Sequence, residues 1–299
     1  MKRVNLLAII AISVSLSSMV SCTTDLTTGT DASLTTTATD ESQASSVNDQ
    51  VVSSTDDYLT NLDASGYQAV NGYQAVKGSE NSEPQKSGVY LTNDSVKITI
   101  DRYGLNDYPK NIIIDFGTKG ITVKRGNILK GKIYITVSNK MSIANSTRTL
   151  RFSDFFVNDN SVKGNKVVTY MGLNLESKPY WTIAANDTIT RVDGTKIIWN
   201  TERTRTRMDD NQTPKIYWDD TYSITGTSSG VNAKGVTYTM VIQAANPLIT
   251  VGDFPYFIKG SVIITTENKT VLVDYGDGTK DAIATATING VTKQFNMKK

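Results

Sequence analysis

Three arginines stand at alternate positions within residues 202–207, where single threonines separate Arg203, Arg205 and Arg207. Because successive side chains of an extended strand point to opposite faces, the three guanidinium groups would share one face at intervals of about 7 Å. Such a row could bind phosphate, sulfate or an acidic sugar. It could equally be a solvated face whose arginines pair with acids on the neighbouring strand.

The three tryptophans are the second group that could bind a ligand. Trp181, Trp199 and Trp218 lie close together in the sequence, beside Tyr180 and Tyr217. Exposed aromatic rings are a common platform for sugars, so carbohydrate binding is one hypothesis for this group. Burial of these large rings in a core is the alternative, because it is strongly favourable.

Two adjacent acids, Asp219 and Asp220, follow Trp218. Glycoside hydrolases that use only carboxylates need two acids about 5–10 Å apart, so this pair is the candidate for such an enzyme. Adjacent residues of a strand point to opposite faces, however, and this disfavours their acting on one substrate. A cap at a loop end and a partner for a nearby arginine are the structural alternatives.

The stretch "VDYGDGTKDA" (Val273–Ala282) contains the candidate metal ligands Asp274, Asp277 and Asp281. Their spacing lacks the alternate-position ligands and the distal glutamate of an EF-hand loop. An earlier stretch, "IIIDFGTKG", repeats the order of an apolar strand, an aspartate, an aromatic residue and a glycine. We therefore predict two matched strand exits, in which aspartate caps the turn and glycine supplies positive φ, and no metal site.

The composition excludes several kinds of catalysis. The chain contains no histidine and one cysteine, Cys22. Catalytic triads and dyads that use histidine, and most zinc sites, are thereby excluded. We expect no cofactor and no enzymatic activity. Nucleic acid is not an expected partner of an exported chain whose positive charge is spread along it.

The N-terminus reads as an export signal. Lys2 and Arg3 precede an apolar stretch that is too short to span a bilayer. The stretch then ends in "SLSSMVSC", which resembles a bacterial lipobox with Met19 in place of leucine. This predicts a signal peptide over residues 1–21 and a lipid, of the palmitate class, on Cys22. We expect anchoring at the outer membrane, on its periplasmic or its surface face.

Residues 22–86 differ sharply in composition from the remainder of the chain. They are rich in Ser, Thr and Asp, and they hold ten acids and two bases, a net charge of −8. Residues 87–299 carry a net charge of +8. With few large apolar residues to offset the entropy of ordering, residues 22–86 are predicted to form a disordered acidic tether.

The remaining residues, 87–299, show the pattern of an antiparallel β domain. Runs such as "SVKITI", "KIYITV" and "VTYTMVI" are rich in Val, Ile, Thr and Tyr, and turn residues bound them. Asp193-Gly194 and Asn289-Gly290 are predicted two-residue hairpin turns. The expected fold is all-β, an antiparallel sandwich or an incomplete barrel of about ten or more strands.

Several blocks of this domain, in their order, resemble a family of uncharacterised β-rich lipoproteins typical of the Bacteroidetes. They include "IIIDFGTKG" (Ile112–Gly120), "KGKIYITV" (Lys130–Val137), "IIWNTERTRT" (Ile197–Thr206) and "LVDYGDGTKDAIATATING" (Leu272–Gly290). The resemblance implies a β-rich fold and a place in the cell envelope, but no activity.

The sequence therefore predicts an outer-membrane lipoprotein with a non-catalytic binding or structural role. Its expected partners are the membrane, through the N-terminal lipid, and a glycan or another envelope protein. A carbohydrate-binding module that uses exposed Trp and Tyr side chains is the first alternative, and a carboxylate-only glycoside hydrolase is the second.

Overall fold

The computed structural model describes residues 29–64, 73–75, 88–92, 95–101, 106–209, 220–267 and 269–298. In these residues, one long helix, α1 (Gly29–Ala64), precedes a series of strands. A single 3-10 turn, η1 (Lys124–Gly126), lies between the fifth and sixth strands. The predicted all-β character of the folded domain is confirmed, with the helix as an addition.

The strands all belong to one sheet and run in chain order. They are β1 (Tyr73–Ala75), β2 (Gly88–Thr92), β3 (Lys97–Ile100), β4 (Lys110–Asp115), β5 (Ile121–Thr122), β6 (Ile128–Val137), β7 (Thr147–Val157), β8 (Asn160–Leu173), β9 (Pro179–Thr190), β10 (Lys196–Asp209), β11 (Thr221–Val231), β12 (Thr237–Ile242), β13 (Leu248–Val251), β14 (Lys259–Thr266), β15 (Lys269–Asp277), β16 (Ile283–Ile288) and β17 (Val291–Asn296).

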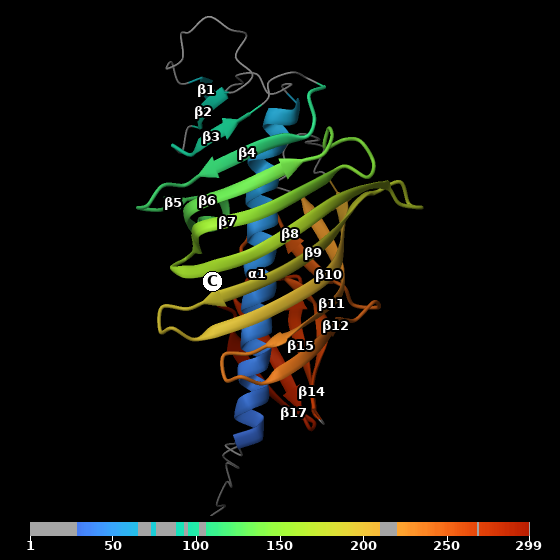
Figure 1. The fold of residues 1–299 in the computed structure, drawn as a ribbon. Coiled ribbons are helices and arrows are strands. Elements are labelled where there is room, and N and C mark those ends of the chain that lie inside the picture. Colours follow the sequence, from blue (N-terminus) through green and yellow to red (C-terminus); the bar gives the residue numbers. More distant parts are fainter. Residues whose placement is uncertain are drawn as a thin grey trace, which may run out of the picture.

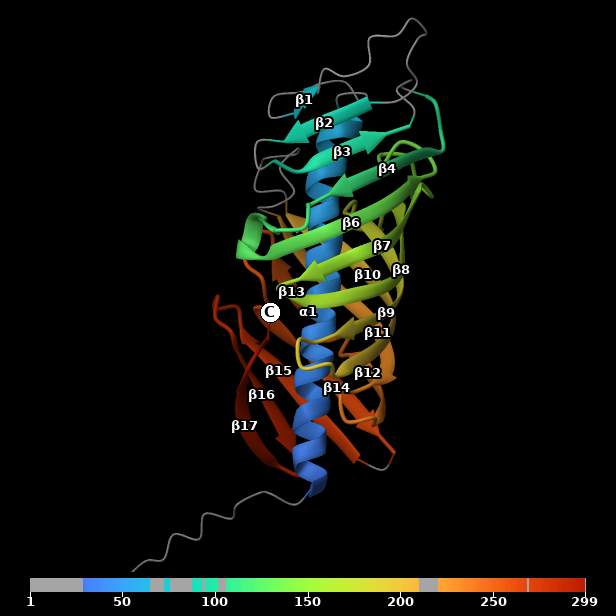
Figure 2. The ribbon, with the colours of Figure 1, turned by 60° about the vertical axis from the view of Figure 1, so that its left-hand side comes forward.

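The sheet is an antiparallel meander. Strands that are neighbours in sequence pair with each other, apart from two places. The first is β5, which pairs only with β6 beside the longer β4–β6 pair. The second is β12 and β13, which do not pair with each other. Strands β12 and β13 share one position, because β11 pairs with both of them and so does β14. Figures 1 and 2 show the sheet curled around α1, which runs along its axis. Of the two predicted architectures, the fold is therefore the incomplete barrel.

The helix occupies the space that the sheet encloses. Every residue from Asp40 to Val52 is buried, and these thirteen positions include all faces of the helix. The prediction of a disordered tether over residues 22–86 is therefore wrong for Gly29–Ala64. The physical reason is that the sheet supplies the partners that this polar segment lacks on its own. Strand β1 also lies within the predicted tether, so structure begins before residue 87.

Two features allow a segment rich in Ser and Thr to be helical. Several of its hydroxyl groups donate within the helix, since Thr36, Thr37 and Thr39 each donate to the carbonyl four residues earlier at 2.9 Å. Its few apolar side chains then join the main core. Leu34, Val47, Val51, Leu59 and Leu62 are at most 2% exposed and pack against the inward side chains of the strands.

One of the two predicted two-residue hairpin turns is confirmed. Asn289 and Gly290 both have positive φ, of 52° and 80°, as a type I′ hairpin turn requires. Asp193 and Gly194 instead lie in a five-residue turn, in which the Arg191 N–H donates to the Thr195 carbonyl at 2.9 Å. The predicted two-residue turn is wrong at this position. The hydrogen bonds from the Thr195 N–H and hydroxyl to the Asp193 carboxylate stabilise the longer form.

Candidate functional site

The acidic helix and the basic inner face of the sheet form the helix–sheet interface, the most distinctive polar feature of the molecule. Helix α1 contains seven acids and no base. Five of these acids form ion pairs with cations of the sheet and its loops. The pairs are Asp40–Arg191, Glu41–Arg203, Asp49–Arg125, Asp56–Arg148, Asp56–Arg205 and Asp57–Lys124.

Glu41 is the most deeply enclosed of the helix acids. Its side chain is fully buried, and it accepts a hydrogen bond from Trp199 Nε1 at 2.8 Å and from Ser45 Oγ at 2.7 Å. Arg203 Nη2 lies 3.3 Å from Glu41 Oε1, and the guanidinium group is stacked 5.0 Å from the Trp199 ring centroid. One carboxylate thus binds a cation and an indole N–H in a site without exposure to water.

Asp56 contacts two arginines from two strands that do not pair with each other. Arg148 of β7 and Arg205 of β10 both contact its carboxylate, at 2.5 and 3.2 Å. The Arg205 guanidinium carbon also lies 3.6 Å from the centroid of the Tyr222 ring. Arg207, the third arginine of its row, instead contacts Asp220 at 3.7 Å. Through Asp56, the helix therefore links β7 and β10, which are separated in the sheet by β8 and β9.

These contacts change the interpretation of the arginine row. The prediction that Arg203, Arg205 and Arg207 share one face is confirmed, since all three side chains turn to the interior or its rim. An exposed site for an external anion is not what they form, because Arg203 and Arg205 are each 3% exposed. Their anions are carboxylates of α1, rather than acids of a neighbouring strand. The alternation of residues along a strand shows which side chains share a face, but it does not show which of the two faces is buried.

A second buried ion pair lies next to the helix. Lys166 of β8 and Asp187 of β9 contact each other, and Lys166 Nζ also donates to Asn48 Oδ1 of α1 at 3.0 Å. Lys166 is 0% exposed and Asp187 4%. Burial lowers the pKa of Lys166 below its usual 10.5 although the Asp187 carboxylate opposes this, and burial raises the pKa of Asp187 above 3.8. Because water cannot solvate either group, each charge is stabilised mainly by its partner.

Asp49 shows the opposite balance. Burial alone would raise the pKa of the Asp49 carboxyl. The nearby positive charges of Arg125 and Arg205 lower it by more than burial raises it, so this pKa lies below its usual 3.8. Arg125 Nη1 donates to Asp49 Oδ2 at 2.8 Å, and Thr250 Oγ1 donates to the same oxygen at 3.1 Å. Ionised Asp49 therefore stabilises the folded state.

This arrangement predicts an acid-sensitive contribution to stability. A carboxyl whose pKa is lowered by folding stabilises the protein above its unfolded pKa, and that stabilisation is lost as the pH falls below 3.8 toward the folded value. We expect Asp49→Asn to lower the unfolding free energy by about 3 kcal/mol near neutral pH. The difference from the wild type should shrink steadily at acid pH. Urea unfolding of both proteins at a series of pH values measures it, and a difference independent of pH would contradict the assignment.

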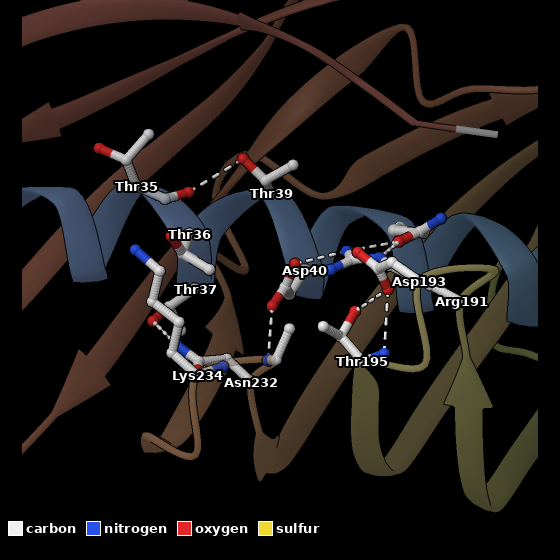
Figure 3. A network of polar contacts seen from close by, with 12 residues as sticks. Thr35, Thr36, Thr37, Thr39, Asp40, Arg191, Asp193, Thr195, Asn232 and Lys234 are labelled. Carbon is white, nitrogen blue, oxygen red and sulfur yellow. Dashed lines mark hydrogen bonds and ion pairs between the residues drawn. The ribbon is translucent and has the colours of Figure 1, made fainter.

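Figure 3 shows a network of polar contacts between the N-terminal part of α1 and two hairpin loops of the sheet. Asp40 accepts hydrogen bonds from Arg191 Nη2 and, at 2.8 Å, from the Ala233 backbone N–H. Asn232 Nδ2 donates to Thr37 Oγ1 at 2.8 Å. The β9–β10 and β11–β12 turns thus hold the helix near its N-terminal end.

The tryptophans are not the exposed platform that the carbohydrate hypothesis requires. Trp199 is 0% exposed and lies in the core. Trp181 is partly buried and packs on Val52 of α1, with the Tyr170 ring centroid at 5.5 Å. The core alternative is therefore correct for Trp199, and Trp181 also faces the helix. Trp218 lies outside the described residues.

The candidate acid pair is only partly described. Asp219 lies outside the described residues, whereas Asp220 is 0% exposed. The carboxylate of Asp220 accepts from the Tyr222 hydroxyl at 3.0 Å and contacts Arg207. For Asp220, the structural alternative, a partner for an arginine, is confirmed. Cys22 and the predicted signal peptide, residues 1–21, also lie outside the described residues.

The C-terminal aspartates cap turns, as predicted. Asp274 Oδ1 accepts from the Gly276 N–H at 2.7 Å, and Asp277 and Asp281 each accept from the N–H two residues later. Asp115 does the same with Gly117 at 2.9 Å, so the two matched strand exits share one geometry. In the described part of the chain, no group of three or more acids, cysteines or histidines could hold a metal ion.

Sequence reasoning missed Asp40, Glu41, Asp49 and Asp56, because they lie in the segment predicted to be disordered. The signal that could have found them is the charge balance. Residues 22–86 carry a net charge of −8, and residues 87–299 carry +8. Many of these opposite charges form ion pairs at the helix–sheet interface.

Comparison with known proteins gives no relative. No family model matches the chain, and neither a curated protein nor a solved structure is similar to it. Within the described ranges, α1 lacks the apolar length that a bilayer span would need.

Proposed function

We propose that the protein is a lipid-anchored component of the outer membrane with a non-catalytic binding or structural role. The observation that supports this most directly is the position of α1. The helix begins at Gly29, seven residues after Cys22, so the chain between them reaches at most about 25 Å. A lipid on Cys22 would be joined by this short segment to a helix locked inside the sheet.

In this proposal, the helix–sheet interface makes the anchor and the domain one mechanical unit. Buried ion pairs along α1 resist withdrawal of the helix, because separating any pair would leave a charge buried without its partner. The domain would be held near the membrane surface, rather than at the end of a long tether. Its resemblance to β-rich envelope lipoproteins is consistent with that position.

A non-catalytic role agrees with the use of the charged residues. The chain has no histidine, and the interior carboxylates are bound to arginine or lysine rather than turned toward a cleft. Carboxylate-only glycoside hydrolysis has little support, because Asp220 is buried in an ion pair.

Metabolic labelling tests the anchor. Cells that express the full chain and receive a palmitate analogue should label the wild type at the outer membrane, and Cys22→Ala should lose both the label and the membrane association. Asp187→Ala, a variant that perturbs the folded domain and keeps Cys22, serves as the control and should still be labelled. Equal labelling of the Cys22→Ala variant would overturn the proposal.

A further inference from the structure

The outer face of the sheet carries an unusual row of threonines in register. One threonine from each of five neighbouring strands, β7 to β11, lies beside the next, and each is partly exposed. The row is Thr147, Thr169, Thr182, Thr204 and Thr225. Figure 1 shows these strands side by side on the near face. At about 4.8 Å between strands, the hydroxyl groups form a regular line.

A second polar row runs parallel to the first, four residues away along each shared strand, at about 14 Å. It consists of amides and hydroxyls from strands β8 to β12. Its members are Asn165, Asn186, Asn200, Ser229 and Thr239. The residues named in the two rows present donors and acceptors without a charge on both sides of a strip of the sheet. On β7, the exposed Arg151 lies beside Asn165 and continues the line of the second row.

Between the rows lies a trough. Its floor is the intermediate row Val167, Ala184, Glu202, Thr227 and Val241. Two adjoining hollows, of about 460 and 440 Å³, lie over this floor and share Ala184, Glu202 and Thr227. Glu202 lies at the middle of this row, between Ala184 and Thr227, and its side chain is exposed. We name this feature, with its two rows, the outer trough.

The chemistry of the outer trough favours a neutral, hydroxyl-rich ligand. Glu202 is the single charged residue of the three rows. An anionic ligand in the two hollows would meet this carboxylate without a basic side chain over the floor, because Arg151 on β7 lines neither hollow. A polycation would meet a single acid there. Hydroxyl and amide groups instead both donate and accept, which suits the hydroxyls of a sugar chain. Glu202 would accept from such hydroxyls as a charge-assisted partner.

Tyr180 adds the apolar contact that sugars commonly use. It lies on the same outer face of β9, two residues before Thr182, and is partly exposed. Unlike Trp181, which faces the helix, the Tyr180 ring can stack on the C–H face of a pyranose beside the middle of the threonine row, on the side away from Ala184.

We propose that the outer trough binds a neutral glycan chain, which lies across strands β8 to β12. The proposal deepens the binding role suggested above and rests on it only for the location of the ligand in the envelope. The tryptophans take no part in this site. The contacts are instead the two polar rows, Glu202 and Tyr180.

The test uses the full-length protein purified in detergent, with a panel of neutral polysaccharides for pull-down and calorimetry. We expect at least one polysaccharide to bind the wild type, and the double variant Thr182→Val/Thr204→Val to bind about tenfold more weakly. Valine keeps the shape and strand preference of threonine while removing the hydroxyl. Glu202→Gln should weaken binding to a similar degree.

Thr285→Val is the matched control, because Thr285 lies on β16, away from the outer trough, and is also partly exposed. It should bind like the wild type, and all variants should keep the melting temperature of the wild type. Full binding by Thr182→Val/Thr204→Val, or no retention of the wild type on any neutral polysaccharide, would overturn the inference. Either result leaves the palmitate labelling of Cys22 unaffected, so the two proposals fail separately.

Discussion

Replacing Asp187 with alanine is expected to lower the free energy of unfolding by about 3–5 kcal/mol. The variant leaves the Lys166 ammonium group fully buried, with Asn48 Oδ1 at 3.0 Å as a neutral partner. The interior cannot solvate a single charge at this position, so the penalty is far larger than that of a lost surface contact. Urea unfolding followed by circular dichroism measures the difference.

Two further variants make the result specific to the buried pair. Asp253→Ala removes an ion pair with Lys280 in which both side chains are about half exposed, and it should cost at most about 1 kcal/mol. Lys166→Met/Asp187→Leu removes both charges and should recover most of the lost stability. If Asp187→Ala cost no more than Asp253→Ala, the pair would not be buried in the way the structure shows.

The stability of Asp187→Ala should also depend on pH. A lysine whose folded pKa lies below its unfolded value of 10.5 destabilises the protein while it is charged. This penalty is complete below the folded pKa and disappears as the pH rises toward 10.5. The deficit of the variant relative to the wild type should therefore narrow with rising pH, as measured by unfolding in urea at several alkaline pH values.

The second large effect is expected for Glu41→Leu, at about 3–5 kcal/mol. The change leaves Arg203 buried without its carboxylate and removes the acceptor of the Trp199 indole N–H. Glu41→Gln should lie between this variant and the wild type, because its amide oxygen still accepts from Trp199 but carries no charge. Thermal and urea unfolding of the three proteins measure their order of stability.

Asp57→Ala is the control on the same helix. Its partner Lys124 has a side chain that is 49% exposed, so the loss should be at most about 1 kcal/mol. Equal losses for Asp57→Ala and Glu41→Leu would contradict the view that α1 is held by its buried charges.

The strands could be predicted from the sequence because their signal is local. Alternation of β-branched and polar residues, with turn residues between, was sufficient for the antiparallel sheet and for capping by Asp115 and Asp274. The same alternation could not show which face is inside. At β10, Arg203 and Arg205 face the interior, whereas Thr204 and Thr206 face outward, because the interior contains carboxylates instead of a purely apolar core.

The helix could not be predicted by the same reasoning. Its burial depends on partners more than a hundred residues away, such as Arg203 for Glu41 and Arg191 for Asp40. A weak local signal exists, since Val47, Val51, Tyr58 and Leu62 fall on one helical face. Between them are mainly Ser, Thr, Asp and Asn, which in isolation favour turns and disorder.

Hydrogen exchange of the full-length protein tests most directly whether α1 is an internal helix held by the sheet. The amides of residues 40–52 should be as strongly protected as those of the central strands β8 to β10, because they open only when the sheet itself unfolds. Exchange at the rate of an unstructured peptide over these residues would show an exposed acidic tether and would contradict the account.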